Sequence, residues 1–222
     1  MRELGLQGKR KGIVKQKTTN SKHSHAIAEN KLERKFDAEK PNRAWVADLT
    51  YIPTLEGWLF LAIVIDLFSR KIVGWSMSES LERAGPIRVP FCPRQSKVVL
   101  DALEMARSSR NPLPGLLHHS DRGVQYSAGA HRLALEKFGA ISSMSRKGNC
   151  WDNAVSESAF ATLKCELDLE IAIGTRAETR AIVFEWIEVW YNRERRHSSL
   201  GFLAPAVFEA KHLTLFSTST KS

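Results

Sequence analysis

The sequence has few cysteines and no long apolar run, and both absences exclude classes of protein. Its three cysteines, Cys92, Cys150 and Cys165, form neither an even set nor a C-x-x-C pair, which argues against a disulfide framework and a cysteine zinc site. No stretch approaches the roughly 18 consecutive apolar residues of a membrane span, and the basic N-terminus lacks the apolar segment of a secretory signal. We therefore expect a cytoplasmic protein with reduced thiols and no membrane contact.

Most of the net charge of +9 lies near the N-terminus. Residues 1–43 contain twelve Lys and Arg against five Asp and Glu, a net charge of +7, so the other 179 residues contribute only +2. A flexible polycation gains affinity for phosphate backbones by releasing counterions. A tail that only raises solubility is the alternative, and no amphipathic apolar face supports a membrane role. We expect residues 1–40 to form a flexible basic arm.

From residue 44 onward the pattern alternates between strands and helices. Three apolar, β-branched and aromatic runs at 44–53, 58–67 and 71–77 are separated by the short turns Glu56-Gly57 and Ser69-Arg70, and they predict an antiparallel meander. Two short strands are expected at 116–119 and 140–143, and helices at about 98–107, 127–138, 153–168 and 176–191. The order predicts an α/β fold, a sheet flanked by helices, with an apolar content of 43% that suffices for one core.

Turn and capping residues predict several boundaries. Residues 82–95 contain three prolines and are expected to form an exposed, mobile loop, after which Ser96 caps a helix. Gly139 is expected at the C′ position of the helix that starts near Ser127. Thr175 and Glu178 form a T-x-x-E capping box, and Asp152 or Asn153 is expected to cap the helix before it.

Asp48 stands inside the strand-like run 44–52, where a carboxylate is unexpected. Acidic side chains are depleted in strands and rarely buried unpaired, so this carboxylate calls for a compensating cation such as a divalent metal. Asp121 follows a short strand and Glu157 lies in the first two turns of a helix, so both are candidate co-ligands. From the residues alone, Asp121 also suits turn chemistry, Glu157 suits a solvated helix start, and Asp66 competes with Asp48.

Five segments resemble the catalytic subunit, the second reading frame, of bacterial insertion-sequence family three transposases: Trp45–Ile52, Asp66–Trp75, His119–Tyr126, Ser143–Ser158 and Tyr191–Gly201. The resemblance covers about residues 40–210. It implies a ribonuclease-H-like fold with a mixed five-stranded sheet. It also places Asp48, Asp121 and Glu157 on the DDE carboxylates that this family shares with retroviral integrases, with Asp48 on the central first strand, Asp121 after the adjacent fourth strand and Glu157 on a helix beside them.

The same resemblance implies DNA transposition. Two Mg²⁺ ions, with Mn²⁺ as a substitute, would be held by the three carboxylates, Asp48 bridging both. Water would first free a 3′-hydroxyl at the element end, and that hydroxyl would then attack target DNA. The implied partners are DNA, further copies of the chain on DNA, and a separate first-frame protein with a helix-turn-helix, all in the bacterial nucleoid.

Basic and aromatic residues near the triad are candidate DNA contacts. Lys164 lies seven residues, two helical turns, after Glu157 and faces the same side. The others lie in the loop before that helix and after the last long helix: Arg146, Lys147, Asn149, Trp151, Arg193, Arg195 and Arg196. The alternatives are a snorkelling surface lysine, a tryptophan that anchors the loop in the core, and a solvated helix end.

Other residues suit structural roles better. Imidazoles rarely bind Mg²⁺, so His118 and His119 are expected to be structural. A tyrosine recombinase is rejected because Tyr191 lies inside an apolar helix, where nothing activates its hydroxyl.

The resemblance is incomplete at two places. Met1–Gly8 resembles the last turn of the upstream helix-turn-helix region, so residues 1–40 would be its remnant, with an integrase core and helical extension over 41–210 and a tail over 211–222. Residues 82–95 form a longer link than the family uses. An inactive remnant that only binds DNA or a transposase, and a ribonuclease-H-type nuclease acting on RNA–DNA hybrids, remain alternatives. Metal-dependent nicking would separate the enzyme from the remnant.

Overall fold

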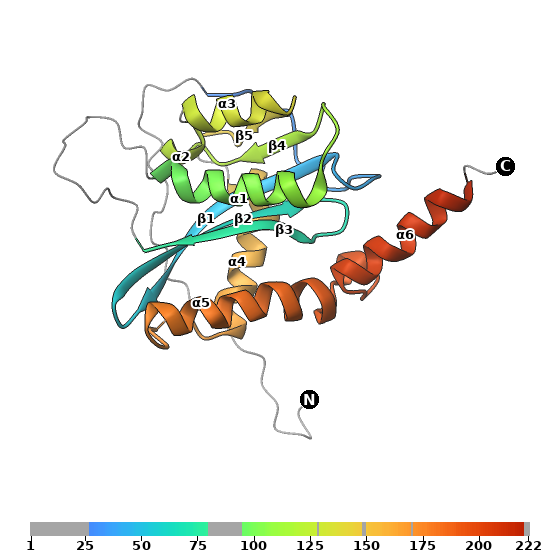
Figure 1. Cartoon of the computed structure of the whole chain (residues 1–222). Coiled ribbons are helices and arrows are strands. Elements are labelled where there is room, and N and C mark those ends of the chain that lie inside the picture. Colours follow the sequence, from blue (N-terminus) through green and yellow to red (C-terminus); the bar gives the residue numbers. More distant parts are fainter. Residues whose placement is uncertain (1–26, 80–94, 128, 148–149, 170, 220–222) are drawn as a thin grey trace.

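The computed structural model describes residues 27–79, 95–127, 129–147, 150–169 and 171–219 (Figure 1). Most of the expected basic arm, residues 82–94 of the expected proline-rich loop, and Asn149 lie outside these ranges. None of the helices within them is both long and apolar enough to cross a membrane.

Five strands form one mixed sheet in the order β3-β2-β1-β4-β5. They are β1 Ala44–Thr54, β2 Gly57–Asp66, β3 Ile72–Ser78, β4 Leu117–Ser120 and β5 Ile141–Met144. The first three pair antiparallel, and β4 and β5 join as parallel strands beside β1. The prediction of a mixed five-stranded sheet with the first strand at its centre is confirmed.

Helices cover both faces of this sheet (Figure 1). The longer ones are α1 Gln95–Arg110, α3 Gly129–Lys137, α4 Ala154–Glu166, α5 Arg176–Glu185 and α6 Pro205–Ser219. The short ones are α2 Val124–Ser127 and the turns η1 Cys150–Asn153 and η3 Ser198–Leu200, while η2 Trp186–Glu194 is a π-helix that continues α5. In Figure 1, α1 crosses in front of the sheet, α4 lies behind it, and α6 extends away from it.

The long apolar strands are explained by burial on both faces. Along β1, Val46 and Ile52 pack in one cluster with α4, α5 and η2, whereas Trp45 and Ala47 pack in the other cluster with α1 and α3. Because successive side chains of a strand point to opposite faces, a strand covered on both sides has no position for a polar surface residue. Asp48 is an exception, because it places a carboxylate in this covered strand.

The contact between α1 and β3 depends on Gly74. A Cβ atom at this position would lie 2.2 Å from the carbonyl oxygen of Ala102 and 2.7 Å from the Cβ of Ala106, both on α1. The helix therefore packs on the strand at a distance that only glycine permits.

Two predicted helix boundaries are confirmed. The Thr175 hydroxyl accepts the Glu178 N–H at 3.3 Å, and the Glu178 carboxylate accepts the Thr175 N–H at 2.8 Å, which completes the capping box. Gly139 has a φ of +69°, and the N–H of Ala140 returns to Leu135 O at 3.0 Å, so glycine ends α3 as expected.

The helix expected to start near Ser127 is α3, which begins at Gly129, while Ser127 itself is the last residue of α2 and donates its hydroxyl to Gly123 O. Two other expectations about helices were wrong. Asn153 occupies the N-cap position of α4 without a side-chain hydrogen bond, and Asp152 is bound elsewhere. The helix expected over 176–191 is α-helical only as far as Glu185 and continues as the π-helix η2, whose i→i+5 hydrogen bonding keeps residues at five-residue spacing, such as the buried Trp186 and Tyr191, on one face.

Residues 27–40 differ from the flexible arm that the charge pattern predicted. Leu32 is 2% exposed and belongs to the core cluster on the α4 side of the sheet. The backbone N–H groups of Lys31 and Leu32 donate to the Ser143 hydroxyl at 2.9 and 3.2 Å. This segment is therefore part of the folded core.

Candidate active site

The sheet register places Asp48 and Asp121 at the same point of two neighbouring strands. Ala47 of β1 pairs with Ser120 of β4 in the parallel ladder, and each aspartate is the next residue along its chain. Glu157 comes from the first turn of α4, which packs on β1. Three elements that are distant in sequence thus bring the three predicted carboxylates to the same region, where the β1–β4 ladder ends.

Asp48 is the electrostatic centre of this group. Burial raises the pKa of Asp48 well above its ordinary value, and repulsion from the Asp121 carboxylate and, more weakly, from Glu157 raises it further. Hydrogen bonds from the Leu49 N–H, at 2.8 Å, and from the Ser156 hydroxyl favour the charged form and oppose the rise. A cation at this place would relieve the repulsion that the three carboxylates impose on one another.

The three carboxylates have the chemistry of a divalent-metal site, but their side chains are not gathered around one point. Within the described ranges, no three His, Cys, Asp or Glu side chains stand close enough together to hold an ion as they are. The chemistry of the donors nevertheless suits a hard cation, because carboxylate oxygens are the ligands Mg²⁺ prefers. Asp121 is half-buried and Glu157 is exposed, so a ligand set requires these two side chains to move toward Asp48.

The turn after Asp121 is shaped by that same carboxylate. Its Oδ1 accepts the Gly123 N–H at 2.8 Å, so the turn chemistry considered for Asp121 is present alongside its place in the triad. A Cβ at Gly123 would lie 2.8 Å from this oxygen and 2.7 Å from Gln125 Oε1, so a larger residue here would displace these two side-chain oxygens.

Tyr126 is a residue near the carboxylates that sequence patterns did not identify. Its side chain is 3% exposed, and its hydroxyl has no hydrogen-bond partner among the described residues. Burial raises the pKa of Tyr126 well above its ordinary value, and the charges of Asp48 and Asp121 raise it further. The unsatisfied hydroxyl therefore lies within electrostatic reach of two triad members. A buried tyrosine five residues after Asp121 has no distinguishing sequence signal.

The loop before α4 is fixed by the buried carboxylate of Asp152. It accepts hydrogen bonds from the backbone and guanidinium of Arg146, from Arg34 Nε at 3.0 Å and from Asn30 Nδ2 at 2.9 Å. These bonds, above all those from Arg146, hold the pKa of Asp152 well below its ordinary value. Arg146, a predicted DNA contact, is thus bound to the protein, although its side chain is still 54% exposed.

The other predicted contacts in this region remain accessible. Lys147 is exposed, and Trp151 is 68% exposed, so the alternative in which this tryptophan anchors the loop in the core is wrong. Lys164 is half-buried, with its Nζ 5.1 Å from the centre of the Tyr51 ring. Asn149 lies outside the described residues.

The basic cluster after η2 divides into paired and exposed members. Arg195 Nε donates to Glu166 Oε1 at 2.9 Å, whereas Arg193 and Arg196 are exposed.

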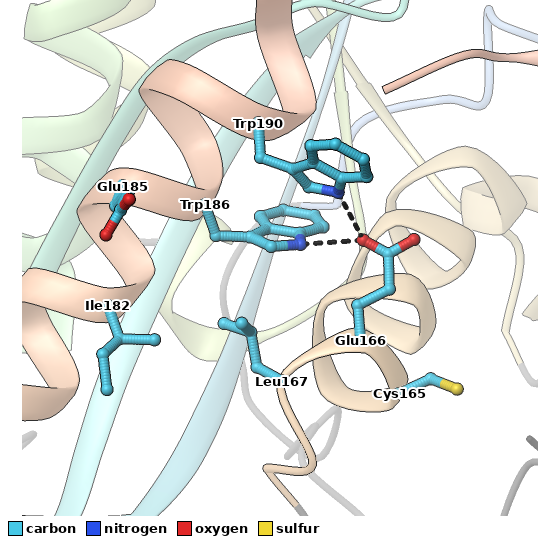
Figure 2. Close-up of a pocket in the computed structure, with 7 residues that line it drawn as sticks. All are labelled: Cys165, Glu166, Leu167, Ile182, Glu185, Trp186 and Trp190. Carbon is cyan, nitrogen blue, oxygen red and sulfur yellow. Dashed lines mark hydrogen bonds between the residues drawn. The ribbon is translucent and has the colours of Figure 1, made fainter. Parts of the chain in front are cut away.

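Glu166 Oε2 also accepts the indole N–H groups of Trp186 and Trp190 (Figure 2). These side chains border an open groove of about 600 Å³ lined by Cys165, Glu166, Leu167, Ile182, Glu185, Trp186 and Trp190. Because Glu166 lies nine residues after Glu157, about 13 Å along α4, the groove is separate from the carboxylates.

The remaining polar candidates have structural roles. His119 is fully buried between the hydroxyls of Ser143 and Ser145, and burial lowers its pKa to about 4. Asp66, the competitor of Asp48, is buried and accepts the N–H groups of Asn42 and Phe68. Tyr191 is 3% exposed and burial raises its pKa, which agrees with the rejection of a tyrosine nucleophile.

Comparison with protein families gives two matches. An integrase core domain model matches residues 38–150, and a second model of the same description matches residues 139–205.

Three curated relatives are each 43% identical to this chain. The "Insertion element IS600 uncharacterized 31 kDa protein" of Shigella sonnei matches over 95% of this chain and 72% of its own length. The "Transposase for insertion sequence element IS904" of Lactococcus lactis subsp. lactis (strain IL1403) matches over 94% and 77%, respectively. The "Transposase InsF for insertion sequence IS3A" of Escherichia coli (strain K12) matches over 86% and 62%.

Solved structures share the fold at low sequence identity. The HTLV-2 integrase catalytic core domain in complex with magnesium superposes with a TM-score of 0.52 at 13% identity, over 78% of this chain and 99% of that one. The catalytic domain of Mos1 mariner transposase superposes with a TM-score of 0.51 at 13% identity, over 67% and 71%. These two likenesses concern the arrangement of the sheet and helices, which is ribonuclease-H-like.

Proposed function

The chain belongs to the integrase core domain family of insertion-sequence transposases, and we propose that Asp48, Asp121 and Glu157 are its catalytic metal ligands. Its function is DNA transposition, and its activity is that of a DDE polynucleotidyl transferase. The alternative of a ribonuclease acting on RNA–DNA hybrids has no support beyond the shared fold.

One observation carries the assignment of the triad. Asp48 is the one acidic residue of β1, whose other residues are apolar or aromatic apart from Thr50 and Thr54, and its pKa is raised by burial and by the charges of Asp121 and Glu157. Burial and repulsion from two neighbouring carboxylates make the ionised form of Asp48 unfavourable, and a bound divalent cation would offset both effects. Asp66, the other aspartate in an apolar strand, has its hydrogen bonds completed by backbone N–H groups and Arg110.

We propose that the site takes two Mg²⁺ ions, or Mn²⁺ in their place. Bound ions of this kind stabilise both the attacking and the departing oxygen of a phosphodiester and need no protein nucleophile. Asp48, between the other two carboxylates, would bind both ions, and Asp121 and Glu157 would each bind one. The Leu49 N–H and the Ser156 hydroxyl favour the ionised form of the Asp48 carboxylate and so oppose the burial and repulsion that raise its pKa, and a bound cation would favour the ionised form further.

The reaction sequence consists of two in-line displacements at phosphorus. In the first, water attacks a phosphodiester at the element end, the bond to the leaving oxygen breaks, and a 3′-hydroxyl is released. In the second, this hydroxyl attacks a phosphodiester of the target, so that a new bond replaces the one that breaks. The exposed position of Glu157 and the half-buried position of Asp121 leave the side of the site opposite Asp48 accessible to DNA.

We propose two sets of DNA contacts around the carboxylates. Lys147, Asn149 and Trp151 belong to the loop before α4, and Lys164 follows on α4 itself. Arg193 and Arg196 form the second set, after η2. Arg146 and Arg195 are ion-paired with Asp152 and Glu166, and a guanidinium has five N–H donors, so each can also donate to a phosphate.

The wider assembly is also a proposal. We propose that the catalytic core with its helical extension covers residues 41–210 together with residues 27–40, which pack on it, that α6 continues this extension beyond residue 210, and that the basic segment before the core contacts DNA in the nucleoid. Several copies of the chain would act together on the element ends, with a separate first-frame protein that contributes a helix-turn-helix.

The test is metal-dependent cleavage of duplexes that carry the element ends. Asp48→Asn, Asp121→Asn and Glu157→Gln should each abolish cleavage in Mg²⁺ and Mn²⁺ while DNA binding is retained. Glu136→Gln is the matched control, because Glu136 is an exposed carboxylate on α3, paired with Arg132 and remote from the triad. Normal cleavage by one triad variant, at equal thermal stability, would remove that residue from the site.

A further inference from the structure

The hairpin of β1 and β2 has a partly exposed aromatic face. Tyr51 pairs with Phe60 and Pro53 pairs with Trp58 across the two strands, so these four side chains lie on one face of the hairpin. Trp58 is 45% exposed, and its ring meets the Tyr51 ring edge-on with 4.9 Å between the ring centres. Neither ring belongs to the two buried core clusters.

This aromatic pair is connected to the proposed catalytic centre through α4. Tyr51 follows Asp48 by three residues, so the two side chains leave opposite faces of β1, but Lys164 follows Glu157 by seven residues, about 10 Å along one side of the helix. The Lys164 Nζ lies 5.1 Å from the centre of the Tyr51 ring, so β1 and α4 run side by side from the carboxylates to this point. The pairing of β1 with β4 covers Ala44–Ala47 and ends before Asp48.

The charges around the hairpin favour an anionic ligand. Lys164 contributes a positive charge directly at the Tyr51 ring. Of the neighbouring acidic side chains, Glu79 forms ion pairs with Arg176 and Arg180 at 3.7 and 3.5 Å, and Glu56 is turned to the backbone N–H of Arg176, which it accepts at 2.7 Å. A phosphate would therefore meet a lysine next to aromatic rings, which is the combination that single-stranded nucleic acid binds.

We propose that Tyr51 and Trp58 form a stacking subsite for an unpaired base of the DNA substrate, with Lys164 on the adjoining phosphate. The substrate class rests on the proposed function. The separation of about 10 Å corresponds to about three nucleotides at the 3.4 Å spacing of one strand in duplex DNA. An unpaired base fits better than the interior of a duplex, because an aromatic ring can stack only on a base whose face is not covered by a neighbouring base.

Equilibrium binding without divalent metal tests the subsite independently of cleavage. The full chain is titrated with a blunt duplex and with the same duplex carrying a single-stranded overhang of about three nucleotides, with 2-aminopurine at each overhang position in turn. The wild type should bind the overhang duplex more tightly and change the fluorescence of one position. Trp58→Ala should weaken overhang binding by roughly five- to a hundredfold and leave blunt binding unchanged, while Trp58→Phe retains most of the preference.

Leu55→Ala is the control, because Leu55 is 72% exposed in the same hairpin and has no ring to stack on a base. Equal losses on both duplexes, or no fluorescence change in the wild type, would overturn the subsite. Loss of self-association in Trp58→Ala, with DNA binding intact, would instead identify an interface between copies and also overturn it. If the overhang preference is absent while cleavage requires the triad, only the subsite fails. If the preference is present while triad variants cleave normally, only the proposed function fails.

Discussion

The guanidinium of Arg146 lies against the carboxylate of Asp152, with Nε to Oδ2 at 3.0 Å and Nη2 to Oδ1 at 2.9 Å. The same carboxylate accepts hydrogen bonds from Asn30 and Arg34, more than a hundred residues earlier in the chain. Asp152 therefore joins residues 27–40 to the loop that leads into α4, and so contributes to the position of Glu157.

Asp152→Ala is expected to destabilise the protein by about 1–3 kcal/mol, because it leaves the part-buried backbone N–H of Arg146 and two guanidinium groups without their shared acceptor. Arg132→Ala removes an exposed pair with Glu136 and should change stability by less than about 1 kcal/mol. Chemical denaturation of both variants measures the difference. Equal effects would mean that the Asp152 network adds no more than a surface ion pair.

The network also predicts a dependence on pH. Since the folded-state pKa of Asp152 is lowered, its contribution is fully present above the ordinary aspartate value, about 4, and is lost as the pH falls below it toward the folded value. The stability difference between the wild type and Asp152→Asn should therefore shrink below about pH 4. A difference that stays constant across the acid range would contradict this origin.

Asp48→Asn is expected to raise the melting temperature at neutral pH when no divalent metal is added. The folded-state pKa of Asp48 is raised, so its ionisation destabilises the fold as the pH rises from about 4 through that value. Removing the charge should gain roughly 2–4 °C for each kcal/mol of repulsion relieved. Added Mn²⁺ should stabilise the wild type and not the variant. A wild type that is indifferent to Mn²⁺ in a melting scan would argue against a metal at Asp48.

Tyr126→Phe is expected to leave stability unchanged or raise it. The Tyr126 hydroxyl is buried with no hydrogen-bond partner among the described residues, and a buried unsatisfied hydroxyl costs about 1–3 kcal/mol. Denaturant unfolding of the variant is the measurement, with Tyr51→Phe as a control at a partly exposed ring. A loss of more than about 1 kcal/mol would show that the hydroxyl bonds to a neighbouring carboxylate.

Deletion of residues 1–26 should weaken binding to all DNA sequences similarly and make the salt dependence shallower. These residues contain seven Lys and Arg, and each lost phosphate contact lowers the slope of log K against log salt by about 0.9. The deletion ends before Leu32, because that residue is buried in the core. Salt titrations of the two proteins with equal slopes would show that the segment does not contact phosphates.

The fold was largely predictable because its strongest signals are local. The apolar runs around Val46 and Ile63 indicated strands, and the Thr175–Glu178 box and Gly139 marked helix ends through their own backbone chemistry. The pairing of Ala47 with Ser120, which aligns two of the three carboxylates, is a tertiary relationship that only the family resemblance suggested.

What could not be predicted depends on contacts between distant segments. Asp152 appeared to be a helix cap, because nothing in the sequence indicates that Arg34 reaches it. The π-helix η2 places Asn192 where its amide completes hydrogen bonds with the backbone of Ile72, a constraint that helix propensity does not contain. The unsatisfied hydroxyl of Tyr126 is likewise a property of packing.

The central position of β1 has a consequence for how the site moves. Amides of a central strand covered on both faces exchange with solvent only when the whole domain opens, whereas the first turn of a helix frays locally. Hydrogen exchange should therefore be slowest around Val46 and Asp48 and much faster at Glu157. The site would then have one carboxylate anchored in the most persistent part of the fold and another on a segment that can adjust as substrate enters and product leaves.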